Sequence, residues 1–264
     1  MVLVWSSAHL RVFDRQCDDG RMCGRVNMAV DPASLVDELE IDSFRWNVPE
    51  SYNVPPGSPL PIILDRVDAD GQVTRRLEAA RWGLVPGWAK DDKIGFRAFN
   101  ARSETVDSKP MFRSAFTSRR CAVAVNGYYE WEKTESDKQP WYMHADGDDW
   151  IFMAGLFELR QQPPEQVEQS VSDPSVLDGW LVSTTMLTLP ARGHLEQVHH
   201  RMPLFLERDQ IGQWLNPAVD SKADTGQLLE GLLEDVDPDR IKRYEVGAEV
   251  GNVRNNWSGL ADPA

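Results

Sequence analysis

The chain has 264 residues, which is enough for one large domain or two small ones with a full hydrophobic core. Its net charge of -14 argues against a generally basic nucleic-acid binder, and its bias toward arginine over lysine (21 to 7) and toward aspartate suits a surface exposed to high salt. No stretch approaches the roughly 18 consecutive apolar residues of a membrane span, and three widely spaced cysteines describe no disulfide framework, so we expect a protein of the reducing cell interior.

Residues 1–21 differ from the rest of the chain and carry no recognisable pattern. They lack the basic start and the small-residue cleavage site of a secretory signal. We therefore expect either a wrongly assigned upstream start or a removable leader, followed by one domain over residues 22–264.

Cys23 follows Met22 directly, so removal of the preceding residues would make Cys23 the first residue. Its free amine and its thiol would then sit on adjacent carbons. The amine condenses with an aldehyde, the thiol closes onto the imine, and a five-membered thiazolidine forms. The simpler alternative is that Cys23 is a small buried side chain, since free cysteine is among the most buried residue types.

The remaining pattern predicts many short strands and few helices. Asp31 and Pro32 provide an N-cap and a first-turn proline for a helix that extends to about residue 40. Residues 53–57 read as a rigid proline loop, 83–88 as a turn, and 160–179 as an exposed insertion. Two further helices are expected over 207–215 and 225–233. Strands are predicted at 25–28, 60–66, 75–82, 121–125, 128–132, 141–144, 150–157, 181–185, 202–206 and 243–250.

Two pairs of these strands are read as neighbours. The strands at 121–125 and 128–132 are joined near Asn126-Gly127, a dipeptide typical of hairpins, and 141–144 is paired with 150–157. The pattern as a whole predicts a β-rich α+β domain, with two packed antiparallel sheets or an open, barrel-like core and a few flanking helices.

Positive charge gathers in one segment of this acidic chain. Residues 94–122 contain two anions and six cations, namely Arg97, Arg102, Lys109, Arg113, Arg119 and Arg120. This segment is where an anionic ligand would bind. The alternative is that these cations pair with acids elsewhere in the chain.

Three polar positions are candidates for proton chemistry. The amide of Asn100 could orient a nucleophile and a sugar oxygen, or it could cap a helix. The carboxyl group of Glu130 lies among aromatic residues, which would raise its pKa and suit proton transfer, although a strand-edge glutamate facing water is the plainer interpretation. His199 and His200 precede an apolar strand, so at most one of them faces a given cleft.

A zinc site built from Cys23, one histidine and Glu130 is a competing interpretation. No pair of ligands has the close spacing that usually anchors zinc, so we expect no metal and no cofactor.

Several ordered motifs resemble the SOS response-associated peptidase (SRAP) family, the abasic-site processing proteins that shield damaged single-stranded DNA. They are MCGR (22–25), NVPPG (53–57), RWGLVPGW (81–88), NARSE (100–104), RRC (119–121), GYYEW (127–131), AGLFE (154–158), HHRMP (199–203) and NVRN (252–255). The resemblance implies that Cys23 is the crosslinking nucleophile, that Asn100 orients it, that Glu130 shuttles protons and that His199 assists. The leader before Cys23 departs from the family pattern.

The resemblance also implies self-removal of the residues before Cys23, a covalent link to abasic sites in single-stranded DNA, and some lyase activity. DNA contacts are expected at Arg25, Pro56, Trp82, Trp88, Arg102, Arg113 and Arg201, although tryptophans are more often core residues than stacking surfaces. We expect a monomer in the cytoplasm near the nucleoid, with replication proteins as possible partners. A thiol peptidase acting on other proteins and a non-covalent reader of modified bases remain alternatives.

Overall fold

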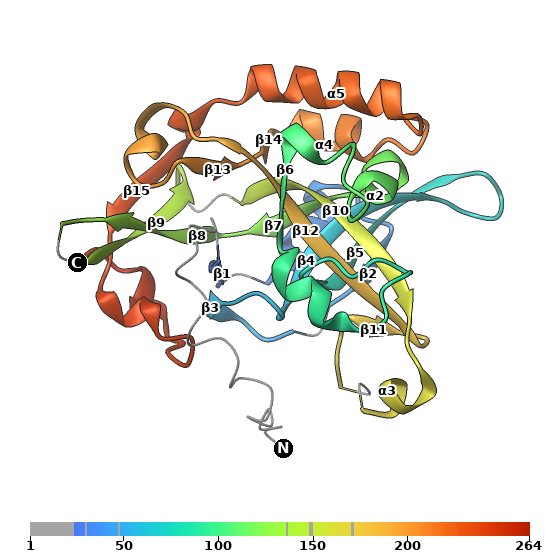
Figure 1. Cartoon of the computed structure of the whole chain (residues 1–264), viewed down its shortest axis with the longest axis horizontal. Helices are drawn as coiled ribbons and strands as arrows, with labels where there is room; N and C mark the ends of the chain where they lie inside the picture. The colour runs from blue at the N-terminus through green and yellow to red at the C-terminus, as the bar shows by residue number, and fades with distance from the viewer. Residues whose placement is uncertain (1–23, 30, 47, 136, 148–149, 170–171) are drawn as a thin grey trace.

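The computed structural model describes residues 24–29, 31–46, 48–135, 137–147, 150–169 and 172–264. Two β-sheets form its centre, and helices cover one side, where α5 lies across the top of the view in Figure 1. The predicted β-rich α+β domain is confirmed. Within the described part of the chain, no helix is both long enough and apolar enough to cross a membrane.

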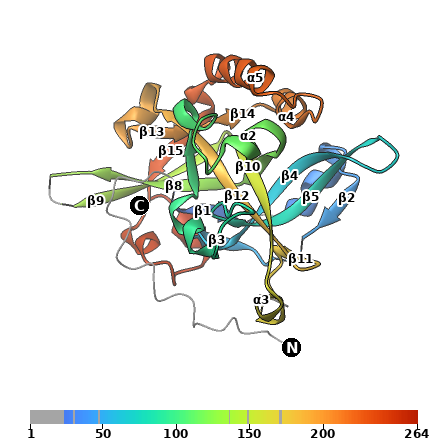
Figure 2. The same cartoon turned by 45° about the vertical axis from the view of Figure 1, so that its right-hand side comes forward.

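The smaller sheet has five strands in the order β15-β9-β8-β1-β3. All of its pairings are antiparallel. Figure 2 shows β8 and β9 extending together away from the rest of the molecule. Its strands are β1 (Val26–Met28), β3 (Ser51–Val54), β8 (Gly127–Lys133), β9 (Lys138–Ala145) and β15 (Ile241–Glu245).

The larger sheet follows the order β11-β12-β10-β7-β4-β5-β2, with β6, β13 and β14 attached beside it. An additional parallel pairing of β12 with β5 closes five of these strands into a ring, so the barrel-like core is closed and not open. Its strands are β2 (Ser43–Arg45), β4 (Pro59–Val67), β5 (Val73–Trp82), β6 (Asn100–Arg102), β7 (Arg120–Val125), β10 (Ile151–Gln161), β11 (Val176–Leu177), β12 (Trp180–Pro190), β13 (Arg201–Pro203) and β14 (Phe205–Leu206).

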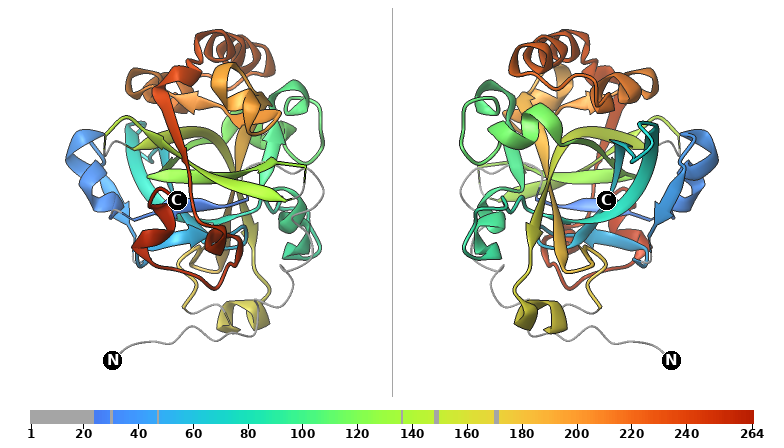
Figure 3. Two further views of the ribbon diagram at one scale, coloured as in Figure 1. Left: turned by 90° about the vertical axis from the view of Figure 1, so that its left-hand side faces the viewer. Right: turned by 90° about the vertical axis from the view of Figure 1, so that its right-hand side faces the viewer.

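The helices are short and amphipathic. Ile211, Trp214 and Leu215 of α4 are buried, as are Leu229 and Leu232 of α5, so both helices pack with their apolar faces toward the sheets. Figure 3 shows α5 above the strands in two opposite views. The helices are α1 (Leu35–Glu38), α2 (Arg113–Ser118), α3 (Pro164–Gln169), α4 (Arg208–Leu215) and α5 (Lys222–Asp235).

The expected hairpin at Asn126-Gly127 is wrong. Strand β7 pairs with β4 and β10 in the larger sheet, whereas β8 pairs with β1 and β9 in the smaller one. The chain therefore passes from one sheet to the other at this point. Gly127 is needed there because a Cβ atom would lie 2.3 Å from the hydroxyl oxygen of Tyr142. The expected pairing of 141–144 with 150–157 is wrong for the same reason, since β9 and β10 belong to different sheets.

Other differences are local. Residues 53 and 54 belong to a strand, because β3 pairs with β1, and residues 100–102 form β6 instead of capping a helix. The strand predicted at 202–206 divides at Leu204, because β13 pairs with β12 and β14 pairs with β10. The last strand ends at Glu245, and a short 3-10 helix follows at Ala248–Gly251. The 160–179 insertion contains α3 and β11.

Candidate functional site

Glu130 lies in the middle of β8, opposite Trp141 of β9. Side chains two residues apart on a strand share a face, so Glu130 points to the same side as Tyr128, which is in the main hydrophobic core. Glu130 is only 4% exposed, so the expected alternative of a water-facing strand-edge glutamate is wrong. A buried carboxyl group therefore lies next to the hydrophobic core on this face of β8.

His199 contacts this carboxyl group. Its Nδ1 lies 3.6 Å from Oε1 of Glu130, and the backbone N–H of Arg201 donates to the same nitrogen at 3.1 Å. The ring of His200 packs on that of His199, with 4.2 Å between centroids. The structure therefore brings together two of the four predicted catalytic side chains.

Burial lowers the pKa of His199 below its ordinary value of 6.5. A hydrogen bond from a protonated Nδ1 to the Arg201 carbonyl, 3.3 Å away, opposes this effect, and the positive charges of Arg201 and Lys133 add to it. His199 is consequently neutral at pH 7 in the folded protein. A neutral imidazole can donate one hydrogen bond and accept another, which suits proton transfer beside a carboxyl group.

This pKa shift predicts a pH-dependent stability. As the pH falls below about 6.5, the unfolded chain protonates His199 more readily than the folded chain, so the free energy of unfolding should decrease. We expect the decrease between about pH 7.5 and about pH 5.5, measured by urea denaturation, to be smaller in His199→Gln. His194→Gln, in the preceding turn, is the matched control. Equal pH dependence in the wild type and His199→Gln would contradict the prediction.

Arg201, the first residue of β13, connects this strand with β12 and with the turn that follows the strand of Asn100. Its guanidinium donates to both carboxylate oxygens of Glu104, and to the hydroxyl oxygen of Thr188 at 3.0 Å. The Thr188 hydroxyl in turn donates to the carbonyl of Ala101 at 3.4 Å. Glu104 and Thr188 were not predicted as site residues. Glu104 belongs to the NARSE motif, but nothing in the sequence indicates Thr188 because its role depends on strand pairing.

Strand β1, near the N-terminus, pairs with β8, the strand that carries Glu130. Arg25 lies beside Tyr129, since the backbone N–H of Tyr129 donates to the Arg25 carbonyl at 2.9 Å. Gly24 is the first described residue, and the predicted nucleophile Cys23 lies outside the described residues. The zinc alternative needs Cys23 and is therefore untested, although the described residues contain no group of three potential ligands.

Three of the predicted DNA contacts are buried. Arg25 is 3% exposed and donates to Asn53 and to the carbonyl of Val250, so it is a structural residue. Trp82 is fully buried, and its indole N–H donates to the carbonyl of Phe99. Pro56 is also buried. None of these three side chains offers a surface to DNA.

The other predicted contacts are accessible to different degrees. Trp88 is 62% exposed, and Arg102 and Arg113 are exposed too. Arg201 is half-buried and bound to Glu104. In the cationic segment, Arg119 pairs with Glu158, as the alternative of distant acidic partners expected. The positive charge at the surface of this segment therefore comes mainly from Arg97, Arg102, Lys109 and Arg113.

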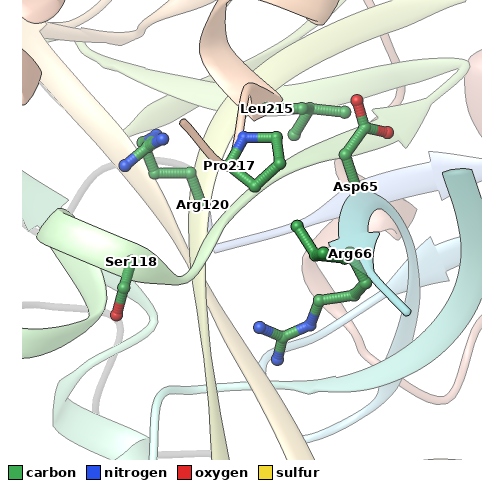
Figure 4. A pocket seen from close by; sticks show the side chains of 7 residues that line it. Asp65, Arg66, Ser118, Arg120, Leu215 and Pro217 are labelled. Atoms are coloured by element: carbon green, nitrogen blue, oxygen red, sulfur yellow. The ribbon is translucent and has the colours of Figure 1, made fainter. Parts of the chain in front are cut away.

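Arg120 is structural. Its guanidinium donates to the carbonyls of Trp214, Asn216 and Val219, which ties β7 to the end of α4, and burial lowers its pKa to about 10. Arg120 also lines a cavity of about 210 Å³. Figure 4 shows the side chains around it, among them Asp65, Arg66 and Leu215. Asn100, Glu130 and His199 do not line this cavity, so it is separate from the candidate site.

Comparisons with known proteins show the family of this chain. A family model described as SOS response associated peptidase matches residues 22–253. The chain belongs to this family. The "Abasic site processing protein YoaM" of Bacillus subtilis is 33% identical over 245 residues, which cover 91% of this chain and 98% of the relative.

Two further proteins are similar to this chain. The "Abasic site processing protein HMCES" of Xenopus tropicalis is 31% identical, over 78% of this chain and 64% of the relative. A crystal structure of a protein from Bacteroides thetaiotaomicron has 22% identity and a TM-score of 0.72, and covers 92% of this chain and 100% of that one. That structure supports the fold alone.

Proposed function

We propose that this SRAP protein recognises abasic sites in single-stranded DNA and links itself to them covalently through Cys23. The active domain comprises residues 22–264, and the residues before Cys23 are removed by the protein itself, which makes it a self-processing cysteine peptidase. The product is a thiazolidine that shields the damaged strand. The names of the curated relatives, which call them abasic site processing proteins, support this proposal.

The observation that carries the proposal is the contact between Glu130 and His199. A buried carboxyl group and a neutral imidazole, 3.6 Å apart, form a proton-transfer pair. Strand β1 runs beside the strand of Glu130, and Gly24, which precedes β1, is bonded directly to Cys23. The strand that carries Glu130 is thus the neighbour of the strand that follows the proposed nucleophile in the chain.

The proposed reaction has two bond-forming steps. The Cys23 amine adds to the aldehyde carbon C1′ of the ring-opened sugar, and loss of water gives an imine. The thiolate then adds to the imine carbon while the nitrogen takes up a proton, which closes the thiazolidine. Glu130 and His199 supply and remove these protons, and Asn100 orients the amine and the sugar. An imine that does not close allows β-elimination of the 3′ phosphate, so some lyase activity follows.

Non-covalent binding precedes this chemistry. Arg102, Arg113 and Arg201 are the proposed phosphate contacts, and Trp88 is the proposed stacking surface. Phosphate contacts weaken as salt rises, whereas the covalent bond retains the strand at any ionic strength. We expect the protein to act as a monomer in the cytoplasm, near the nucleoid and the replication proteins.

A denaturing gel tests the proposal. Protein that begins at Cys23, verified by mass spectrometry, is incubated with a single-stranded oligonucleotide containing one abasic site. We expect an SDS-resistant band of higher mass with the wild type and no such band with Cys23→Ala or with undamaged DNA. A protein with an intact N-terminal extension should not form the adduct, because its residue 23 has no free amine.

The alternatives give different results. A thiol peptidase acting on other proteins would retain its activity when the N-terminus is extended, since it depends on the thiol alone. A non-covalent reader of modified bases would bind DNA without any SDS-resistant adduct. Equal adduct yield from the extended protein would contradict the terminal-amine mechanism.

A further inference from the structure

An arginine that no motif singled out contacts one residue opposite Glu130 and another in the turn before His199. The guanidinium of Arg243, on β15, sits over the ring of Trp141 at 4.5 Å from its centroid. Trp141 is the residue directly opposite Glu130 on the neighbouring strand. Directly opposed residues of antiparallel strands have their Cβ atoms about 5 Å apart on the same face of the sheet, so the side chains of Trp141 and Glu130 leave their strands as neighbours on one face.

A second contact directs Arg243 toward the histidine. Its Nη2 donates to the side-chain oxygen of Gln197, which ends the short helix Gly193–Gln197, two residues before His199. The guanidinium therefore bridges the strand of Trp141 and the turn that carries His199. It is half-buried, and both groups that hold it are neutral.

The charge of Arg243 is consequently not neutralised by its contacts. Within the described ranges, no carboxylate lies within ion-pair distance of this guanidinium. The chain has 42 acidic residues against 28 basic ones, so acidic partners are plentiful. A half-buried cation held by an aromatic face and an amide is arranged to receive an anion, because a guanidinium has five N–H donors and Gln197 accepts from only one nitrogen.

We propose that Arg243, held against Trp141, binds a phosphodiester next to the abasic sugar. The inference rests on the proposed function and adds a ligand-binding residue to it. A sugar whose C1′ lies at Glu130 and His199 has a phosphate on each side, and a non-bridging oxygen of one of them accepts from the free N–H groups of Arg243. The contact anchors the sugar before any covalent step.

Direct binding must be distinguished from mere support of the His199 turn. The probe is a single-stranded oligonucleotide that carries a tetrahydrofuran analogue of the abasic sugar, which has no aldehyde and so reports non-covalent affinity. Two further oligonucleotides carry one neutral methylphosphonate, either 5′ or 3′ of the analogue. The proteins compared are the wild type, Arg243→Met and Arg243→Lys. Arg45→Met, on the exposed strand β2 of the other sheet, is the matched control.

We expect Arg243→Met to weaken binding of the all-phosphate probe about tenfold and Arg243→Lys to restore part of that loss. The slope of log affinity against log salt should decrease by about 0.7 in Arg243→Met. One of the two methylphosphonates should weaken binding by the wild type by a similar factor. The same methylphosphonate should change the affinity of Arg243→Met by less than about twofold, because that variant has already lost the contact. Arg45→Met should behave as the wild type.

The opposite results overturn the inference. If both methylphosphonates weaken the wild type and Arg243→Met by equal factors, Arg243 contacts neither phosphate and only supports the turn. The inference is also overturned if Arg243→Met binds the all-phosphate probe as tightly as the wild type does. Failure of the proposed function is seen separately, as a wild type that binds the analogue but forms no adduct with a true abasic site.

Discussion

Glu130→Gln is expected to slow adduct formation by about 10²- to 10⁴-fold, the range that a positioned acid or base contributes. Glutamine keeps the volume of the buried side chain but cannot take up or release a proton in the relevant pH range. The measurement is the rate at which the SDS-resistant band appears with excess abasic oligonucleotide. Affinity for the tetrahydrofuran analogue should change much less than the rate, because the analogue undergoes no proton transfer.

The control for this substitution is Glu135→Gln. Glu135 is exposed in the same β8–β9 hairpin, so its substitution removes the same charge from the same hairpin. Glu135→Gln should form the adduct at a rate within about a factor of two of the wild-type rate. The prediction fails if Glu130→Gln forms the adduct at the wild-type rate while remaining folded by circular dichroism.

Trp82→Ala is expected to lower the free energy of unfolding by about 3–5 kcal/mol, the usual range for removal of a fully buried tryptophan. Trp82 is completely buried, packs edge-on against Phe99 with 5.8 Å between ring centroids, and lies at the point where β5 pairs with β12 to close the ring. Urea denaturation gives the change directly. Trp82→Phe provides a milder variant if the alanine protein does not fold.

Trp88→Ala is the matched substitution from the same motif. Trp88 is 62% exposed, so its removal should change the free energy of unfolding by no more than about 0.5 kcal/mol. If bases stack on it, affinity for single-stranded DNA should fall by about tenfold. A large loss of stability in Trp88→Ala, or no loss in Trp82→Ala, would contradict the assignment of Trp82 to the core and of Trp88 to the surface.

Strand existence could be predicted from the sequence better than strand pairing. Short runs of apolar and aromatic residues between turn residues identified β4, β7, β8 and β10, and alternation identified β5. The Asn126-Gly127 dipeptide nevertheless suggested a hairpin that does not exist. Turn propensity is local, whereas the choice of β8 to pair with β1 depends on residues about 100 positions apart, such as Tyr128 and Val26.

The short elements were missed for a related reason. Strand β6 has three residues and is polar at its start, so its pattern is too short to distinguish a strand from a helix cap. Its pairing with β12 stabilises it. The same holds for β13 and β14, where the chain changes partner at Leu204.

Of the candidate site, a carboxyl group among aromatic residues indicated Glu130, and a histidine pair before a core strand indicated His199 or His200. The resemblance to the family then selected His199. Only the tertiary structure showed that these two side chains touch, that Trp82 and Arg25 are interior residues, and that Arg243 lies beside Trp141. Burial and contact arise from the pairing of distant strands, and a linear pattern contains residue types but not the register that brings them together.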